Sequence, residues 1–132
     1  MTTIWLIPLL TAGPITTDAA LQPLLDAIRQ VETGSHPDPA NALGDGGRSL
    51  GPYQISRAYW KDSGVPGHYE MVRYRPYAER VIKAYWRRHC PRALARLDFQ
   101  VLARTHNGGP QGPIYPSTLP YWHRVRDRLA QR

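Results

Sequence analysis

A long stretch, residues 35–54, is dense in Gly, Pro, Asn, Asp and Ser and interrupts a chain whose other apolar patterns are helical. This composition does not sustain a regular helix, because Gly and Pro break it and the short polar side chains compete for backbone hydrogen bonds. The stretch therefore predicts a long turn or a short hairpin. A loop of this length inside a small domain is usually functional or disordered, so it also marks where a site is expected.

An amphipathic helix is predicted directly before this loop. Its apolar residues recur at three- and four-residue steps, at Leu21, Leu24, Leu25, Ile28 and Val31. The Thr16-Thr17-Asp18 group supplies an N-cap, and Gly34 is a usual C-terminal stop. Glu32 therefore lies in the last turn, next to the apolar stripe.

Further helical patterns follow the loop. Residues 56–62 form a short helix capped by Ser56, and a longer helix ends at about Cys90, where Pro91 stops it. The apolar positions of the last three patterns are Tyr77, Val81, Ile82 and Tyr85; Leu94, Leu97, Val101 and Leu102; and Leu119, Trp122, Val125 and Leu129. The sequence predicts an α+β, mainly α fold with about five helices and at most a short β-hairpin near residues 40–54.

The length of 132 residues suits one domain, which we place at residues 21–132. Residues 1–20 are expected to be an N-terminal extension or a degenerate signal segment. The apolar run at residues 4–10 lacks the positive residue that usually begins a secretory signal, and Pro8 interrupts it. The run is also far shorter than the roughly 20 apolar residues that span a bilayer, so no transmembrane segment is expected.

The single cysteine and the positive charge limit the chemistry. Cys90 cannot form an internal disulfide and offers no metal cluster, so neither a metal nor a cofactor is expected. The formal net charge of +7 favours an acidic polymer as partner, whether nucleic acid, an anionic membrane face or a bacterial wall. Solubility alone is the alternative explanation of this charge.

Two carboxyl groups at the loop suggest acid–base chemistry. Glycoside hydrolysis needs one carboxylic acid that gives a proton and a second carboxylate that stays charged. The macrodipole at a helix C-terminus and partial burial both disfavour an anion, so we expect a raised pKa for Glu32. Asp45, flanked by glycines, is the candidate second carboxylate, and Asp38 competes with it. The alternatives are a surface glutamate and an ordinary turn aspartate.

Read in order along residues 24–129, six segments resemble the invertebrate-type lysozymes, also called the destabilase-like family. The segments are VETGS, GDGGRSLGPYQI, AYWKDSG, VIKAYWRRH, ARTHNGGPQGP and TLPYWHRVRDRL. The resemblance implies a small lysozyme-like domain that hydrolyses the β-1,4 bond between N-acetylmuramic acid and N-acetylglucosamine in peptidoglycan. Peptidoglycan is then the expected partner, and nucleic acid is not.

The same resemblance implies the site residues. The family's proton donor falls on Glu32 and its second carboxylate on Asp45. The implied substrate-binding residues are Ser49, Tyr53, Gln54, Tyr59, Trp60, Lys61, Tyr85, His106, Asn107 and Gly108. The chain departs from the family in two ways: it has one cysteine where the family is rich in disulfides, and the spacing from Glu32 to Asp45 is longer by a residue.

Three rival functions remain open from the sequence. A lytic transglycosylase would use Glu32 alone and leave an anhydro sugar. An isopeptidase acting on glutamyl-lysine crosslinks would need a dyad such as Ser49 with His106. A non-catalytic binder of nucleic acid or wall polymer would act through its arginines, although no nucleic-acid motif occurs among the basic segments. A lysozyme is expected to be secreted or in the cell envelope, while a cytoplasmic address and the oligomeric state stay open.

Overall fold

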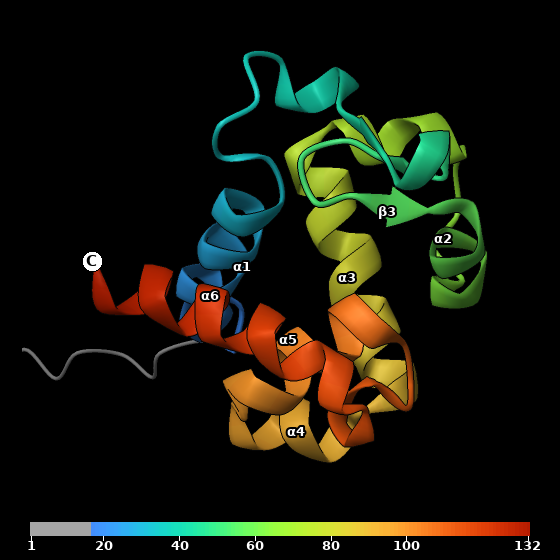
Figure 1. The fold of residues 1–132 in the computed structure, drawn as a ribbon. Coiled ribbons are helices and arrows are strands. Elements are labelled where there is room, and N and C mark those ends of the chain that lie inside the picture. Colours follow the sequence, from blue (N-terminus) through green and yellow to red (C-terminus); the bar gives the residue numbers. More distant parts are fainter. Residues whose placement is uncertain (1–16) are drawn as a thin grey trace, which may run out of the picture.

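Residues 17–132 are described by the computed structural model (Figure 1). Its α-helices are α1 (Thr17–Thr33), α2 (Arg57–Ser63), α3 (Arg75–His89), α4 (Pro91–Arg96), α5 (Phe99–Gly108) and α6 (Leu119–Ala130). Its strands are β1 (Leu43–Gly44), β2 (Ser49–Leu50) and β3 (Ile55–Ser56). Short 3-10 turns join them, at η1 (Pro39–Asn41), η2 (Asp45–Gly47), η3 (Tyr69–Arg73), η4 (Gly112–Ile114) and η5 (Pro116–Thr118). The predicted α+β, mainly α class is confirmed.

The predicted helix boundaries hold closely, with one exception. The Ser56 hydroxyl accepts a hydrogen bond from the Tyr59 amide and so caps α2 as expected. The single helix predicted through residues 94–102 is wrong, because the chain forms α4 and α5 there. Leu97 adopts a left-handed conformation that ends α4, and the Asp98 side chain then caps α5 by accepting from the Val101 amide. The described residues therefore form six α-helices, where about five were expected.

The loop at residues 35–54 forms most of a small antiparallel sheet in the order β1-β2-β3. Leu43 pairs with Leu50, and Leu50 pairs with Ile55. The hairpin near residues 40–54 was predicted, but the third strand was not, because it holds only two residues and shows no alternation. The sheet places η2, which contains Asp45, between β1 and β2.

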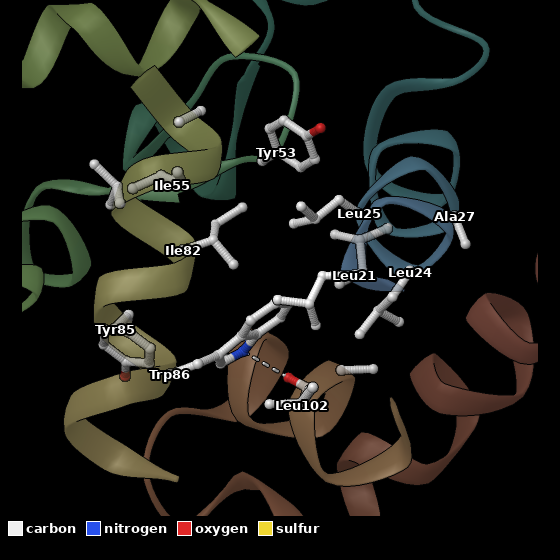
Figure 2. Packing of buried hydrophobic residues seen from close by; sticks show 14 of the residues in the cluster. Leu21, Leu24, Leu25, Ala27, Tyr53, Ile55, Ile82, Tyr85, Trp86 and Leu102 are labelled. Carbon is white, nitrogen blue, oxygen red and sulfur yellow. Dashed lines mark hydrogen bonds between the residues drawn. The ribbon is translucent and has the colours of Figure 1, made fainter. Parts of the chain in front are cut away.

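One apolar core lies between α1, α3 and α5 (Figure 2). Ile82 and Trp86 of α3 meet the leucines of α1, and the Trp86 indole donates a hydrogen bond to the Leu102 carbonyl at 3.0 Å. Fully burying a Leu or Ile side chain contributes about 1.5–3 kcal/mol. This core therefore stabilises the fold without a disulfide bond from Cys90, which is free.

The arrangement of the helices brings distant segments together. Helix α6, red in Figure 1, runs beside α1, and the sheet and α2 lie on the far side of α3. Glu32, in the last turn of α1, lines one cleft with residues of the sheet and of α6. Residues 17–20, predicted as part of an N-terminal extension, belong to α1, while the apolar run at residues 4–10 lies outside the described residues. Within residues 17–132, no helix is long and apolar enough to cross a membrane.

Candidate active site

A cleft of about 880 Å³ opens where the end of α1, the sheet, α2, α3, α5 and α6 meet. Most of the residues that the sequence predicted for the site line this cleft. They are Glu32, Asp45, Ser49, Gln54, Tyr59, Lys61, Tyr85, His106 and Asn107. Segments far apart in the sequence thus converge on one concave surface, as expected of a site that binds a polymer chain.

Three residues predicted for substrate binding do not line the cleft. Tyr53 is buried, and its hydroxyl donates to Glu79 at 2.6 Å on the core side of the sheet. The Trp60 indole donates to the Tyr77 hydroxyl at 2.8 Å, which ties α2 to α3. Gly108 packs so tightly against Thr118 that a Cβ would lie 2.5 Å from the Thr118 methyl, and its neighbour Gly109 lines the cleft instead.

Glu32 is a half-buried carboxyl group in the last turn of α1. Burial raises its pKa to about 7, and the nearby negative charge of Asp45 acts in the same direction. The Tyr121 hydroxyl and the Arg124 guanidinium oppose this rise in pKa, because both favour the charged form. A large fraction of Glu32 is therefore protonated near neutral pH.

Asp45 lies in very different surroundings. Its side chain is exposed, and its backbone takes a left-handed φ of 52°, followed by Gly46 at 67°. The Ser49 hydroxyl donates to Asp45 Oδ2 at 2.9 Å, and the Arg48 Nε donates to the Asp45 carbonyl at 3.0 Å. The Ser49 bond orients the carboxylate, and the Arg48 bond holds the backbone of the irregular turn that carries it. Its competitor Asp38 accepts a bond from Asn41 and does not line the cleft.

His106 is a neutral, buried anchor. Burial lowers its pKa to about 4. Its Nε2 lies 3.1 Å from the Tyr53 carbonyl, which can only accept, so Nε2 carries the proton. Nδ1 must then accept from the Tyr59 hydroxyl, 3.0 Å away. Both ring nitrogens are engaged and the Ser49 hydroxyl donates to Asp45, so these contacts do not form the Ser49–His106 dyad of an isopeptidase.

Tyr59 and Tyr85 form an aromatic wall of the cleft. Their rings stack with centroids 3.7 Å apart and an interplanar angle of 11°. Asp62, one turn after Tyr59, also lines the cleft; His89 of α3 contacts its carboxylate, and the Arg88 guanidinium lies 3.4 Å from it. These contacts hold α2 against α3 and so fix the wall.

Asp62, Tyr121 and Arg124 line the cleft but were missing from the sequence prediction. Tyr121 precedes Val125 by one helical turn, so it shares the buried face of α6, and Arg124 lies beside it. The helical period could place Tyr121 on the inner face. It could not show that this face meets Glu32. Among residues 17–132, no three His, Cys, Asp or Glu side chains lie close enough to hold a metal ion.

No family model matches the chain, but individual proteins do. It is 34% identical to a lysozyme of Meretrix lusoria over 80% of this chain and 87% of the relative, and 30% identical to invertebrate-type lysozyme 3 of Caenorhabditis elegans over 77% and 81%. The crystal structure of Tapes japonica lysozyme superposes with a TM-score of 0.68 at 30% identity, covering 80% of this chain and 87% of that one. The chain spans 60–63% of the length of the oyster lysozymes that it matches.

Proposed function

The chain belongs to the invertebrate-type lysozymes, and from that premise we propose that it hydrolyses the β-1,4 bond between N-acetylmuramic acid and N-acetylglucosamine in peptidoglycan. The observation that carries the proposal is a half-buried Glu32, with its pKa raised to about 7, in one cleft with the exposed carboxylate of Asp45. Glycoside hydrolysis needs two carboxyl groups in contrasting environments, one that gives a proton and one that is charged.

In the proposed reaction the Glu32 carboxylic acid gives its proton to the leaving glycosidic oxygen. Asp45 stabilises the positive charge that develops on the sugar ring, or attacks that carbon, and water completes the hydrolysis. Ser49 holds the Asp45 carboxylate in place through its 2.9 Å hydrogen bond. The partly exposed ring of Tyr59, which stacks on the buried ring of Tyr85, offers an aromatic surface against which a sugar can pack.

The proposed partner is the bacterial wall, which also gives the net charge of +7 a role. A cationic enzyme is attracted to an anionic polymer over a distance that salt shortens. Wall binding should therefore weaken as salt is added. This function implies a place of action at or outside the cell envelope.

The test is the loss of turbidity of a peptidoglycan suspension. Glu32→Gln removes the proton donor, and we expect lysis to fall about 10²- to 10⁴-fold while wall binding is retained. Glu70→Gln is the matched control, because Glu70 is exposed, pairs with Arg73 and lies outside the cleft. Lysis that survives Glu32→Gln would overturn the enzyme and point to wall damage driven by charge.

The second candidate, a lytic transglycosylase, uses an acid without a partner carboxylate. The hydrogen-bonded Asp45 across the cleft favours hydrolysis over this route. Mass spectrometry of the digest separates the two, since hydrolysis leaves reducing ends and the rival leaves anhydromuramyl ends. A digest with anhydro ends alone would replace the hydrolase by the transglycosylase.

A further inference from the structure

The Tyr121 hydroxyl is a buried polar group without a hydrogen-bond partner in the structure. Its side chain is 3% exposed, and it lies on the face of α6 that packs toward α1. Buried hydroxyl groups are nearly always paired, because an unpaired one has lost water and gained nothing. An unpaired, buried hydroxyl group in the cleft therefore needs an explanation.

The Glu32 carboxyl group explains it. Glu32 and Tyr121 line the same cleft, and the hydroxyl is close enough to favour the charged form of Glu32. Solvent does not reach the Tyr121 oxygen, so a substrate hydroxyl does not reach it either. The Glu32 carboxyl group is an acceptor beside this hydroxyl, and it becomes a stronger one when it loses its proton.

We propose that Tyr121 is a positioning residue for Glu32: its hydroxyl donates a hydrogen bond to the carboxylate that forms when Glu32 gives up its proton. The inference rests on the proposed function, in which that proton goes to the leaving glycosidic oxygen. Tyr121 keeps its own proton throughout, because burial and the neighbouring Glu32 hold its pKa well above the usual range. The bond strengthens as charge develops on Glu32, so it stabilises the transition state more than the resting enzyme.

Arg124 acts in the same direction from the next turn of α6. Its guanidinium lies 5.7 Å from the centre of the Tyr121 ring, and its charge lowers the pKa of Glu32. Asp45, on the sheet side, opposes both. The other titratable side chains that line the cleft are Tyr59, Lys61, Asp62, Tyr85 and His106.

The first test compares Tyr121→Phe with Tyr74→Phe, a control whose side chain is 67% exposed and lies outside the cleft. Wall lysis is measured across the pH range for both. For Tyr121→Phe we expect kcat to fall on the order of tenfold with KM little changed. The alkaline limb of the profile should move to higher pH, because Glu32 loses a group that favours its charged form. A lower kcat with an unmoved profile would show a packing role and overturn the inference.

The second test reads Glu32 without any reaction. Carbon-13 NMR of the labelled carboxyl group, assigned with Glu32→Gln, gives its titration midpoint in the wild type and in Tyr121→Phe. We expect a higher midpoint in the variant. An unchanged midpoint with normal wild-type lysis would overturn the role of Tyr121 and leave the proposed function standing. A raised midpoint in proteins that do not lyse the wall would support the hydrogen bond and overturn the function.

A third measurement uses the wild-type protein and does not depend on the folding of Tyr121→Phe. The hydroxyl proton of Tyr121 should move downfield as Glu32 ionises, since its hydrogen bond then forms. The same proton should stay in place in Glu32→Gln. A hydroxyl resonance that does not follow the titration of Glu32 would overturn the inference.

Discussion

The two carboxyl groups of the cleft, Glu32 and Asp45, are held by opposite means. Glu32 belongs to the last turn of a regular helix and is half-buried against α6, while Asp45 is exposed on a glycine-rich turn between two-residue strands. Packing favours the neutral form of Glu32, whereas the Asp45 carboxylate is open to water and accepts a hydrogen bond from the Ser49 hydroxyl. The difference shows how one small domain can hold a largely neutral carboxylic acid and an exposed carboxylate in a single cleft.

Among changes to the exposed carboxylate and its turn, the largest effect should come from removing the charge of Asp45. Asp45→Asn takes away the anion that stabilises the transition state in the proposed mechanism, and we expect wall lysis to fall about 10²- to 10³-fold. The alkaline limb should also move to lower pH, because the Asp45 charge raises the pKa of Glu32. Asp38→Asn is the matched control, an exposed aspartate on the same loop outside the cleft. Equal lysis by both variants would remove Asp45 from the mechanism.

The half-buried carboxyl group of Glu32 should instead affect the free energy of unfolding. The pKa of Glu32 is about 7 in the folded protein and 4.5 as its ordinary value, so the folded state binds the proton more tightly. The wild type should lose stability as pH rises from 4.5 to 7, by about 1–3 kcal/mol after allowance for partial exposure. Glu32→Gln has no such loss.

Urea unfolding at pH 4 and pH 8.5 measures this directly. The gap between Glu32→Gln and the wild type should shift in favour of the variant at the higher pH. Asp45→Asn carries no comparable burial and serves as the contrast. If the difference in stability between the wild type and Glu32→Gln is the same at both pH values, burial does not raise the pKa of Glu32.

A smaller effect is expected from the hydrogen bond that orients the exposed carboxylate. Ser49→Ala removes the 2.9 Å bond to Asp45 Oδ2. One such bond contributes about 1 kcal/mol, so lysis should fall about fivefold. The double variant Ser49→Ala with Asp45→Asn should be no worse than Asp45→Asn alone. Additive losses would show that Ser49 acts on the substrate by itself.

How far the sequence predicts this molecule differs between its regular and irregular parts. The helices follow from apolar spacing and caps, as the Ser56 cap of α2 illustrates. The break between α4 and α5 does not, because Leu97 takes a left-handed conformation that leucine rarely adopts. The strands could not be predicted for another reason: two residues are too few to show an alternation of apolar and polar side chains.

The site divides in the same way. A helix-end glutamate and a glycine-flanked aspartate are visible in the sequence, and both line the cleft. Two contacts could not be predicted: the Tyr121 hydroxyl beside Glu32, and the hydrogen bond from Tyr59 to His106. Each joins two helices, and the local sequence pattern does not show which helices meet. Local periodicity shows which face of a helix is buried, but not which side chains of other elements pack against that face.

The central claim is that burial makes Glu32 a proton donor near neutral pH, in one cleft with the exposed carboxylate of Asp45. The pH dependence of kcat/KM for wall lysis by the wild type tests it most directly. We predict that activity falls along an alkaline limb with a midpoint near 7, the pKa of Glu32. A limb near the ordinary pKa of 4.5, or activity that stays constant from pH 5 to pH 9, would contradict the claim.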